Sequence, residues 1–222
     1  MATKRARRIH DYNQLNSLSS VVLWDTAPRL KKAKTFYEVE RVITRRRIHL
    51  DYEYLIKWKG WSLESCSWEP STNLTEDLIT NYDKPIKISD ERLEGACRQF
   101  VLGISKGLRS RSAAPMYINM DLDIWRYLTC GKGEVSEHRG NKLYQKNDFE
   151  ALKYLPENWW YHINQNGEGI AVDFPLKAKP MLSWSSVNFM KKNGKLCRAA
   201  RMPVEKICLT VIRKACNAEH IV

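Results

Sequence analysis

The sequence predicts an α+β protein, in which a module of three antiparallel strands and a C-terminal helix is followed by a second, unassigned small α+β domain. Short segments rich in β-branched and aromatic residues lie at residues 37–43, 52–58 and 67–69, and such segments favour strands. Apolar residues then recur at helical spacing after residue 75 and again between residues 93 and 108. Residues 113–222 contain four tryptophans, which is more than a disordered segment carries.

Each element of the module has a recognisable beginning or end. The polar segment 45–51 is expected to turn the chain between the first two strands, and Gly60 supplies a residue that tolerates positive φ after the second. Pro70 closes the third strand. Thr75 is suited to cap the helix, because its hydroxyl can accept a hydrogen bond from a free N–H of the first turn. Pro85 then ends that helix.

Charge is unevenly distributed along the chain. The formal net charge is +12, to which residues 1–34, 35–85 and 86–222 contribute +6, −2 and +8. Basic flanks favour contact with DNA or RNA phosphates and include candidate nuclear-import signals, whereas the near-neutral module suits a basic peptide.

We divide the chain into four regions: a basic disordered arm at residues 1–34, the module at 35–85, a helix with a linker at 86–112, and an uncharacterised α+β domain at 113–222. The apolar patch 21–24 of the arm is expected to dock at an unspecified place.

The clearest element of the last region is an amphipathic helix at residues 203–216. Pro203 suits a first helical position, and apolar residues follow it at helical spacing: Val204, Ile207, Cys208, Val211, Ile212 and Ala215. Such an apolar stripe has to be buried against another surface. We favour burial in the core of its own domain, and the alternative is an interface with a second copy of the chain or with another protein.

Several function classes lack the residues that they require. Apolar runs stop far short of the roughly 20 residues that cross a bilayer, so no membrane association is expected. The cysteines lack the spacing of a zinc ribbon and the histidines form no HExxH pair, so neither a metal nor a cofactor is expected. No nucleophile elbow, phosphate loop or paired-carboxylate motif occurs, which argues against an enzyme.

Three motifs in the module resemble the chromodomain family. They are Tyr-Glu-Val-Glu-Arg at 37–41, Tyr-Glu-Tyr-Leu-Ile-Lys-Trp-Lys-Gly-Trp at 52–61, and Trp-Glu-Pro at 68–70 followed by Asn73. The resemblance covers residues 36–82, about a fifth of the chain. The family includes heterochromatin-protein-one, and the motif at 57–61 is particularly similar to chromodomains of Polycomb and Su(var)3-9 type.

The resemblance implies a cage for methylated lysine, formed by Tyr37, Trp58 and Trp61. A quaternary ammonium donates no hydrogen bond and is attracted to ring faces, by on the order of 2 kcal/mol when desolvated. An unmethylated ammonium would lose hydration that the rings cannot replace. Trp58 lies at the end of a predicted strand and Trp61 just beyond it, both among polar neighbours, which is a poor setting for core residues.

The resemblance also implies that the peptide binds as an added strand between the segments 36–39 and 73–75. The residues implied in peptide binding are Phe36, Glu38, Val39, Glu64, Glu69, Asn73 and Thr75. For Glu69 and Asn73, capping of the local backbone is an equally good interpretation. Ser65 stands where an acid often borders the cage, and Thr75 where an acid can clasp the peptide, so modest affinity is expected.

Together these features predict a non-enzymatic, nuclear, chromatin-associated reader of methylated lysine on the histone H3 tail, which recruits or anchors factors on repressed chromatin. In the family the lysine lies in an Ala-Arg-Lys-Ser motif. One alternative is a truncated or divergent Su(var)3-9-type histone methyltransferase, although its catalytic domain and zinc clusters have no counterpart in residues 86–222. The other is a nucleic-acid-binding chromodomain protein, for which Arg45, Arg46 and Arg47 are candidate contacts unless they form a solvated hairpin tip.

Overall fold

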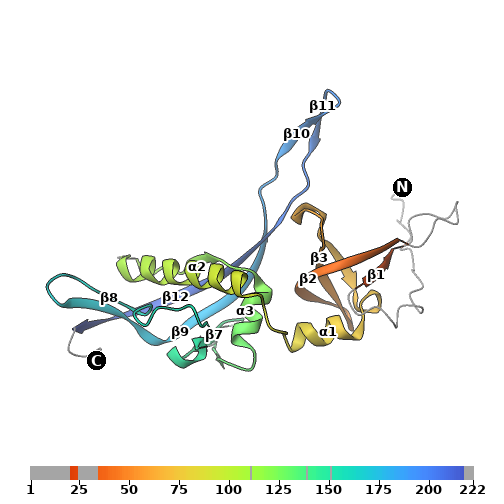
Figure 1. Cartoon of the computed structure of the whole chain (residues 1–222). Helices are drawn as coiled ribbons and strands as arrows, with labels where there is room; N and C mark the ends of the chain where they lie inside the picture. Colours follow the sequence, from red (N-terminus) through yellow and green to blue (C-terminus); the bar gives the residue numbers. More distant parts are fainter. Residues whose placement is uncertain (1–20, 25–34, 111, 139, 151, 218–222) are drawn as a thin grey trace, which may run out of the picture. The chain divides into compact units, whose positions relative to one another are not determined.

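The chain folds into two compact units that divide after Asp83, and each has its own sheet (Figure 1). The computed structural model describes residues 21–24, 35–110, 112–138, 140–150 and 152–217. Helices and antiparallel strands occur in both units, which confirms the predicted α+β class. No helix among the described residues is long and apolar enough to cross a membrane.

The first unit is an antiparallel sheet with strand order β1-β2-β3-β4 and one α-helix. The three predicted strands are β2, β3 and β4, and the predicted helix is α1; their bounds are Thr35–Ile48, Asp51–Trp58, Ser67–Pro70 and Glu76–Asp83. Two 3-10 turns lie at Leu63–Ser65 and Ser71–Asn73. Thr75 caps α1 as predicted, because its hydroxyl accepts a hydrogen bond of 3.4 Å from the Leu78 amide.

The first hairpin turns later than we predicted. Strand β2 continues through the arginine run to Ile48, and the chain turns at His49, which has a φ of 54°, and Leu50. The run 45–47 is therefore part of a strand and not of a hairpin tip. The reason is that each of its residues has a partner on β3, such as Glu53 opposite Arg46, and cross-strand pairs of this kind extend a ladder.

A fourth strand comes from the arm at residues 1–34 that we predicted to be disordered. Val21–Trp24 forms β1, which pairs antiparallel with the first residues of β2, so that Val21 lies opposite Glu38 and Trp24 opposite Thr35. The prediction is corrected for these four residues, because the edge of β2 offers unpaired backbone groups that an apolar segment can satisfy. The basic clusters at 4–8 and 31–34 lie outside the described residues.

One core cluster of the first unit lies between the sheet and α1. Its buried members are Val39, Val42, Tyr54 and Ile56, against which Trp58, Leu74, Leu78, Ile79 and Tyr82 pack. The ring of Tyr82 on α1 stands edge-on to that of Tyr54, with centroids 5.5 Å apart. This packing fixes the end of β3, from which the candidate site is built.

The second unit has a six-stranded antiparallel sheet of order β5-β12-β9-β7-β6, with β8 paired to another part of β9. These strands are β5 Met116–Asn119, β6 Glu134–Val135, β7 Lys142–Tyr144, β8 Tyr161–Ile163, β9 Glu168–Trp184 and β12 Pro203–Asn217. Helices α2 Asp90–Arg109 and α3 Leu122–Thr129 and the 3-10 turn Lys146–Phe149 accompany them. Strands β10 Phe189–Lys192 and β11 Lys195–Arg198 form a separate hairpin that projects beyond the long β9–β12 pair (Figure 1).

Helix α2 confirms the helix predicted from the spacing between residues 93 and 108. We had set residues 86–112 apart as a helix with a linker, but α2 belongs to the second unit. Its buried face includes Phe100, which contacts the rings of Phe149 and Trp159. Gly103 faces Ile118 of β5 so closely that a Cβ atom would collide with that side chain. The first contact ties the helix to the 3-10 turn Lys146–Phe149 and the segment before β8, and the second ties it to the sheet.

The helix that we predicted at residues 203–216 is wrong, because these residues form β12, between β5 and β9. Its buried residues alternate with less buried ones, as in a strand with one covered face: Pro203, Glu205, Ile207 and Leu209. In the sequence this alternation was not recognised, because the charged residue Glu205 occupies one of its buried positions. Its buried carboxylate accepts a 2.7 Å hydrogen bond from the Leu122 amide at the start of α3, which makes a charged residue acceptable there. Burial of Ile207 and Leu209 also removes the helical stripe proposed for a homodimer or protein partner.

Two isoleucines of β12 provide a test of this assignment. Ile207 is 0% exposed and Ile212 is 58% exposed. Ile207→Ala is expected to lower the free energy of unfolding by about 2–5 kcal/mol, since it leaves a cavity. Ile212→Ala is expected to change it by less than about 0.5 kcal/mol. Urea unfolding of both variants measures the difference, and equal destabilisation would contradict the strand.

Candidate functional site

The three predicted aromatic residues meet at one end of the first sheet. Tyr37 lies on β2, Trp58 ends β3, and Trp61 follows in the next loop. The Tyr37 ring centroid lies 6.2 Å from that of Trp58, at an interplanar angle of 67°, and 5.7 Å from that of Trp61, at 74°. The three rings therefore stand as inclined walls and not as a stack.

A pocket of about 250 Å³ opens between these walls, and Ser65 and Ser67 complete its lining. Trp61 is 51% exposed, so this wall faces solvent. No charged side chain lines the pocket. It is smaller than the roughly 300–1,000 Å³ sites that hold drug-sized ligands, and it suits one small apolar or cationic group.

Lys57 holds the loop that carries the two tryptophans. Its ammonium donates hydrogen bonds to the backbone carbonyls of Trp58, at 3.0 Å, and Trp61, at 2.6 Å, and to the Glu40 carboxylate, at 2.7 Å. The Lys57 side chain is buried, so these three bonds replace its hydration. Gly60, with a φ of 76°, allows the chain to turn tightly enough for both carbonyls to reach one ammonium.

A second network orients the Trp58 ring. Its indole N–H donates a 3.0 Å hydrogen bond to the Ser67 hydroxyl, which donates a 2.7 Å bond to the Glu69 carboxylate. The Asn73 amide donates a 3.0 Å bond to the other oxygen of Glu69, and both residues are buried. The resemblance implied that Glu69 and Asn73 contact the peptide; the structure shows them bonded to each other and to Ser67 behind Trp58, which is a structural role.

The other residues predicted to bind peptide are spread along the site. Val39 is a buried core residue, Glu38 forms an ion pair of 2.8 Å with Lys59, and Glu64 is exposed and does not line the pocket. Thr75 is occupied as the cap of α1. The backbone of Phe36 pairs with Leu23 of β1. Strand β1 thus lies on the stretch of β2 to which a peptide strand was predicted to add.

The three arginines predicted as nucleic-acid candidates have partners within the unit. Arg45 forms a 2.7 Å ion pair with Asp83, and Arg47 donates to the His49 carbonyl at 3.2 Å. Arg46 bonds to Glu53 through two nitrogens, and its guanidinium lies 4.1 Å from the ring centroid of Trp68. We predicted Trp68 as a core residue; it is half-buried and covered by this arginine.

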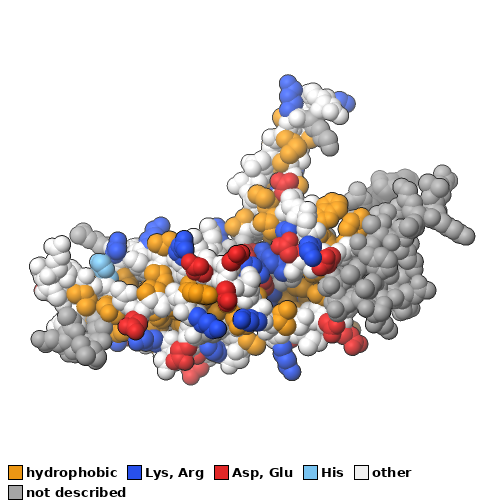
Figure 2. Space-filling model, viewed as in Figure 1, with side chains coloured by type: hydrophobic (Ala, Val, Ile, Leu, Met, Phe, Trp, Pro, Cys, Tyr) orange, Lys and Arg blue, Asp and Glu red, His pale blue; other side chains and the backbone are white. Residues whose placement is uncertain are grey.

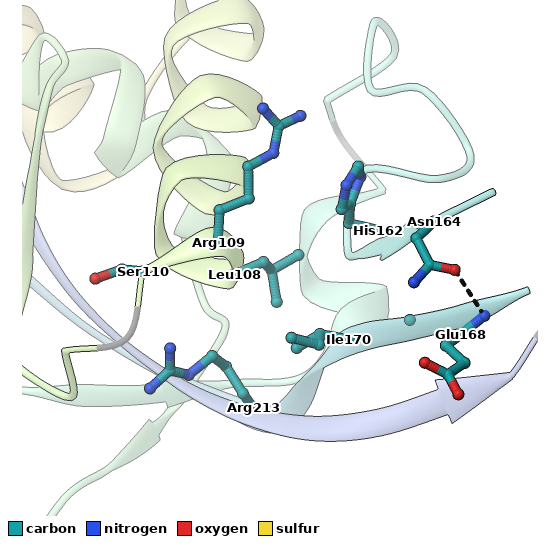
Figure 3. Close-up of a pocket in the computed structure, with 9 residues that line it drawn as sticks. Leu108, Arg109, Ser110, His162, Asn164, Glu168, Ile170 and Arg213 are labelled. Atoms are coloured by element: carbon teal, nitrogen blue, oxygen red, sulfur yellow. Dashed lines mark hydrogen bonds between the residues drawn. The ribbon is translucent and has the colours of Figure 1, made fainter. Parts of the chain in front are cut away.

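A larger and more open depression, of about 490 Å³, lies in the second unit. It lies between the end of α2, the β8–β9 hairpin and β12, and Figure 3 shows that the charged side chains of Arg109, Glu168 and Arg213 point in different directions. Its floor includes Leu108 and Ile170, and its polar groups do not converge on one point (Figure 3). Among the described residues, no three His, Cys, Asp or Glu side chains are grouped to hold a metal ion. The aromatic pocket is therefore the better candidate site.

A small antiparallel sheet, a helix across its end and a pocket of three aromatic rings make up a compact module with a candidate ligand site. The profile of the Chromo (CHRromatin Organisation MOdifier) domain family matches residues 37–85, and this part of the chain is a Chromo domain. The match confirms the family resemblance and the module fold that the sequence predicted.

Curated relatives match mainly over the same segment. Heterochromatin protein 1 of Drosophila melanogaster is 44% identical over 48 residues, which are 21% of this chain and 23% of that protein. Chromobox protein homolog hpl-1 of Caenorhabditis elegans is 38% identical over 55 residues, 24% of this chain and 30% of the relative. Chromodomain Y-like protein 2 of Mus musculus is 30% identical over 110 residues, 48% of this chain but 20% of the relative. The chain thus spans less than a third of these relatives, and no solved structure matches it.

Lys57→Met tests whether the buried ammonium positions the loop. The variant keeps an unbranched side chain of similar length but removes the three hydrogen bonds of the ammonium. It is expected to destabilise the first unit by roughly 1–3 kcal/mol and to speed hydrogen exchange at the Trp61 amide. Lys59→Met is the matched control, because its exposed ion pair with Glu38 contributes only about 0–1 kcal/mol. Equal effects of the two variants would show that Lys57 does not have this role.

Proposed function

We propose that the first unit binds a methylated lysine of the histone H3 tail in the pocket of Tyr37, Trp58 and Trp61. The observation that carries the proposal is a pocket walled by three aromatic rings, without a charged side chain, on a Chromo domain. Ring faces attract a cation without needing a hydrogen-bond donor from it. A methylated ammonium suits such walls, whereas an unmethylated one would leave its donors unsatisfied.

The lining supports a preference for the trimethylated state. A dimethylated lysine keeps one N–H, which needs an acceptor once it leaves water. Ser65 and Ser67 are the polar residues that line the pocket. The Ser67 hydroxyl already donates to Glu69 and accepts from Trp58. An acid at position 65 would pair with that N–H, and serine is a weaker partner for a cation.

The proposal extends to the whole protein as a nuclear, chromatin-associated reader without catalytic activity, which anchors other factors on repressed chromatin. Its relatives include proteins named as a heterochromatin protein and as a chromatin-associated protein, and these names support this part of the proposal. A nucleic-acid-binding chromodomain protein is the competing function. Arg45 and Arg46 give it little support, because each already forms an ion pair within the unit.

Truncating a cage residue tests the proposal directly. Trp61→Ala removes an exposed wall without opening the core, so folding should persist while affinity for a trimethyl-lysine H3 peptide falls. One ring face contributes up to about 2 kcal/mol, which corresponds to a roughly thirtyfold weaker affinity. Titration of a fluorescent peptide carrying the Ala-Arg-Lys-Ser motif, trimethylated on its lysine, measures the change.

Tyr117→Ala is the matched control, since this exposed aromatic residue lies on β5 of the second unit. It should bind the peptide like the unaltered protein. The unmethylated peptide should bind weakly to all three proteins. If Trp61→Ala and the unaltered protein bind the trimethylated peptide equally well, the pocket is not the binding site.

Strand β1 is expected to compete with the peptide, because both would use the outer edge of β2. Val22→Pro with Leu23→Pro should remove β1 from that edge, since proline cannot donate to a ladder. The peptide affinity is then expected to rise a few-fold in the same titration. Replacing Lys4, Arg5, Arg7 and Arg8 by Gln alters the charge of the arm but not β1, and should leave the affinity unchanged. A weaker affinity of the proline variant would instead make β1 part of the binding site.

A further inference from the structure

The β10–β11 hairpin, Phe189–Arg198, has a well-defined turn. Its two turn residues, Asn193 and Gly194, have φ values of 51° and 78°. Asn-Gly is the preferred pair for a two-residue turn in which both residues take positive φ, and its twist matches that of the flanking strands. The sequence therefore specifies the tip of this hairpin locally, a signal that our sequence analysis overlooked.

The base of the hairpin is held by the ends of β9 and β12. The Ser185 amide donates to the Met202 carbonyl, and the Ala199 amide to the Asn188 carbonyl, both at 2.8 Å. The guanidinium of Arg201 donates to the Ser185 carbonyl, at 2.6 Å. Arg201 thus has a structural role. The hairpin continues the long β9–β12 pair outward and is anchored at its base by these bonds (Figure 1).

The hairpin lies in a strongly basic stretch of the sequence. Between Asp173 and Glu205 the chain has seven Lys or Arg residues and no Asp or Glu. Lys191, Lys195 and Arg198 are exposed on the hairpin, and within the described part of the chain none of them forms an ion pair. Figure 2 shows such cations gathered at the tip of the projection. Their charge is available to an external polyanion.

Apolar side chains accompany two of these cations, Lys191 and Arg198, on one face of the hairpin. The register places Phe189 opposite Arg198 and Leu196 opposite Lys191, so that these four side chains share one face of the ribbon. Phe189 is 62% exposed and Leu196 is 74% exposed. An exposed face that mixes apolar and cationic side chains is not one that solvation alone favours, and it indicates a partner.

We propose that the β10–β11 hairpin binds double-stranded DNA, with its cations on the phosphates and its apolar residues against the groove. A two-stranded ribbon fits the B-DNA major groove, which is about 12 Å wide, and β-ribbons are an established way to enter DNA grooves. The major groove of an RNA duplex is too deep and narrow for side chains to read. This site lies in the second unit and is independent of methyl-lysine binding by the first.

The test uses the full chain and a fluorescently labelled DNA duplex of about 20 base pairs, with affinity measured by anisotropy over a range of salt concentrations. A triple variant, Lys191→Gln, Lys195→Gln and Arg198→Gln, is expected to bind at least about tenfold more weakly at low salt. The slope of log affinity against log salt should become shallower by about 0.9 for each phosphate that the variant no longer neutralises. The double variant Lys191→Arg with Lys195→Arg should preserve both values, because the charge remains.

The matched control removes the same charge elsewhere in the second unit, through Lys87→Gln, Lys106→Gln and Lys153→Gln, all exposed lysines. It should keep the slope of the unaltered protein. Equal weakening in both triple variants would overturn the proposal, because nonspecific attraction to the net charge would then explain binding. Tighter binding of an RNA duplex than of DNA would also overturn it. So would a change in molar mass of the hairpin variant in light scattering with DNA binding intact, which would assign the hairpin to a second copy of the chain.

Discussion

The aromatic pocket depends on the burial of one charged group, the ammonium of Lys57. A buried ammonium is tolerated only when its donors are satisfied, and the acceptors available to Lys57 are Glu40 and the carbonyls of Trp58 and Trp61. Because one ammonium bonds to both carbonyls, the loop between the two tryptophans is restricted to one conformation. The distance between two walls of the pocket is therefore set by a hydrogen-bonding constraint below them.

The polar groups of the site divide into two layers with different roles. Lys57, Glu69 and Asn73 lie behind the rings and fix their positions. Lys57 bonds to the backbone carbonyls of Trp58 and Trp61, and Asn73 bonds to Glu69, which accepts a bond from Ser67. The surface that faces the pocket carries two serine hydroxyls and no charge. An uncharged aromatic wall can discriminate by methylation, because the penalty falls on a cation that still has donors to satisfy.

Sequence patterns predicted the elements that depend on local residues. The three strands of the module, the Thr75 cap and helix α2 all have signals within a few residues of themselves. Two errors were local, the overlooked Asn-Gly turn of the β10–β11 hairpin and the turn between β2 and β3 that was predicted too early. The other failures concern elements whose partners are distant in sequence. Glu205 interrupts the apolar alternation of β12, and it is acceptable there only because it bonds to an amide 83 residues away. No residue near position 205 in the sequence indicates that contact. The same apolar residues also fit helical spacing, so the sequence pattern led to a wrong prediction.

The sequence alone determined the chromodomain and, through the resemblance to that family, the three aromatic residues of its candidate site, because the motifs that contain them are local runs of residues. Only the tertiary structure decided how those rings are held, since Ser67, Glu69 and Asn73 acquire their roles from contacts with Trp58 and with one another. It likewise decided that β1 occupies the edge of β2 and that residues 203–217 form a strand. Backbone pairing across long sequence separations depends on which edges remain open after folding, and a local pattern contains no record of that.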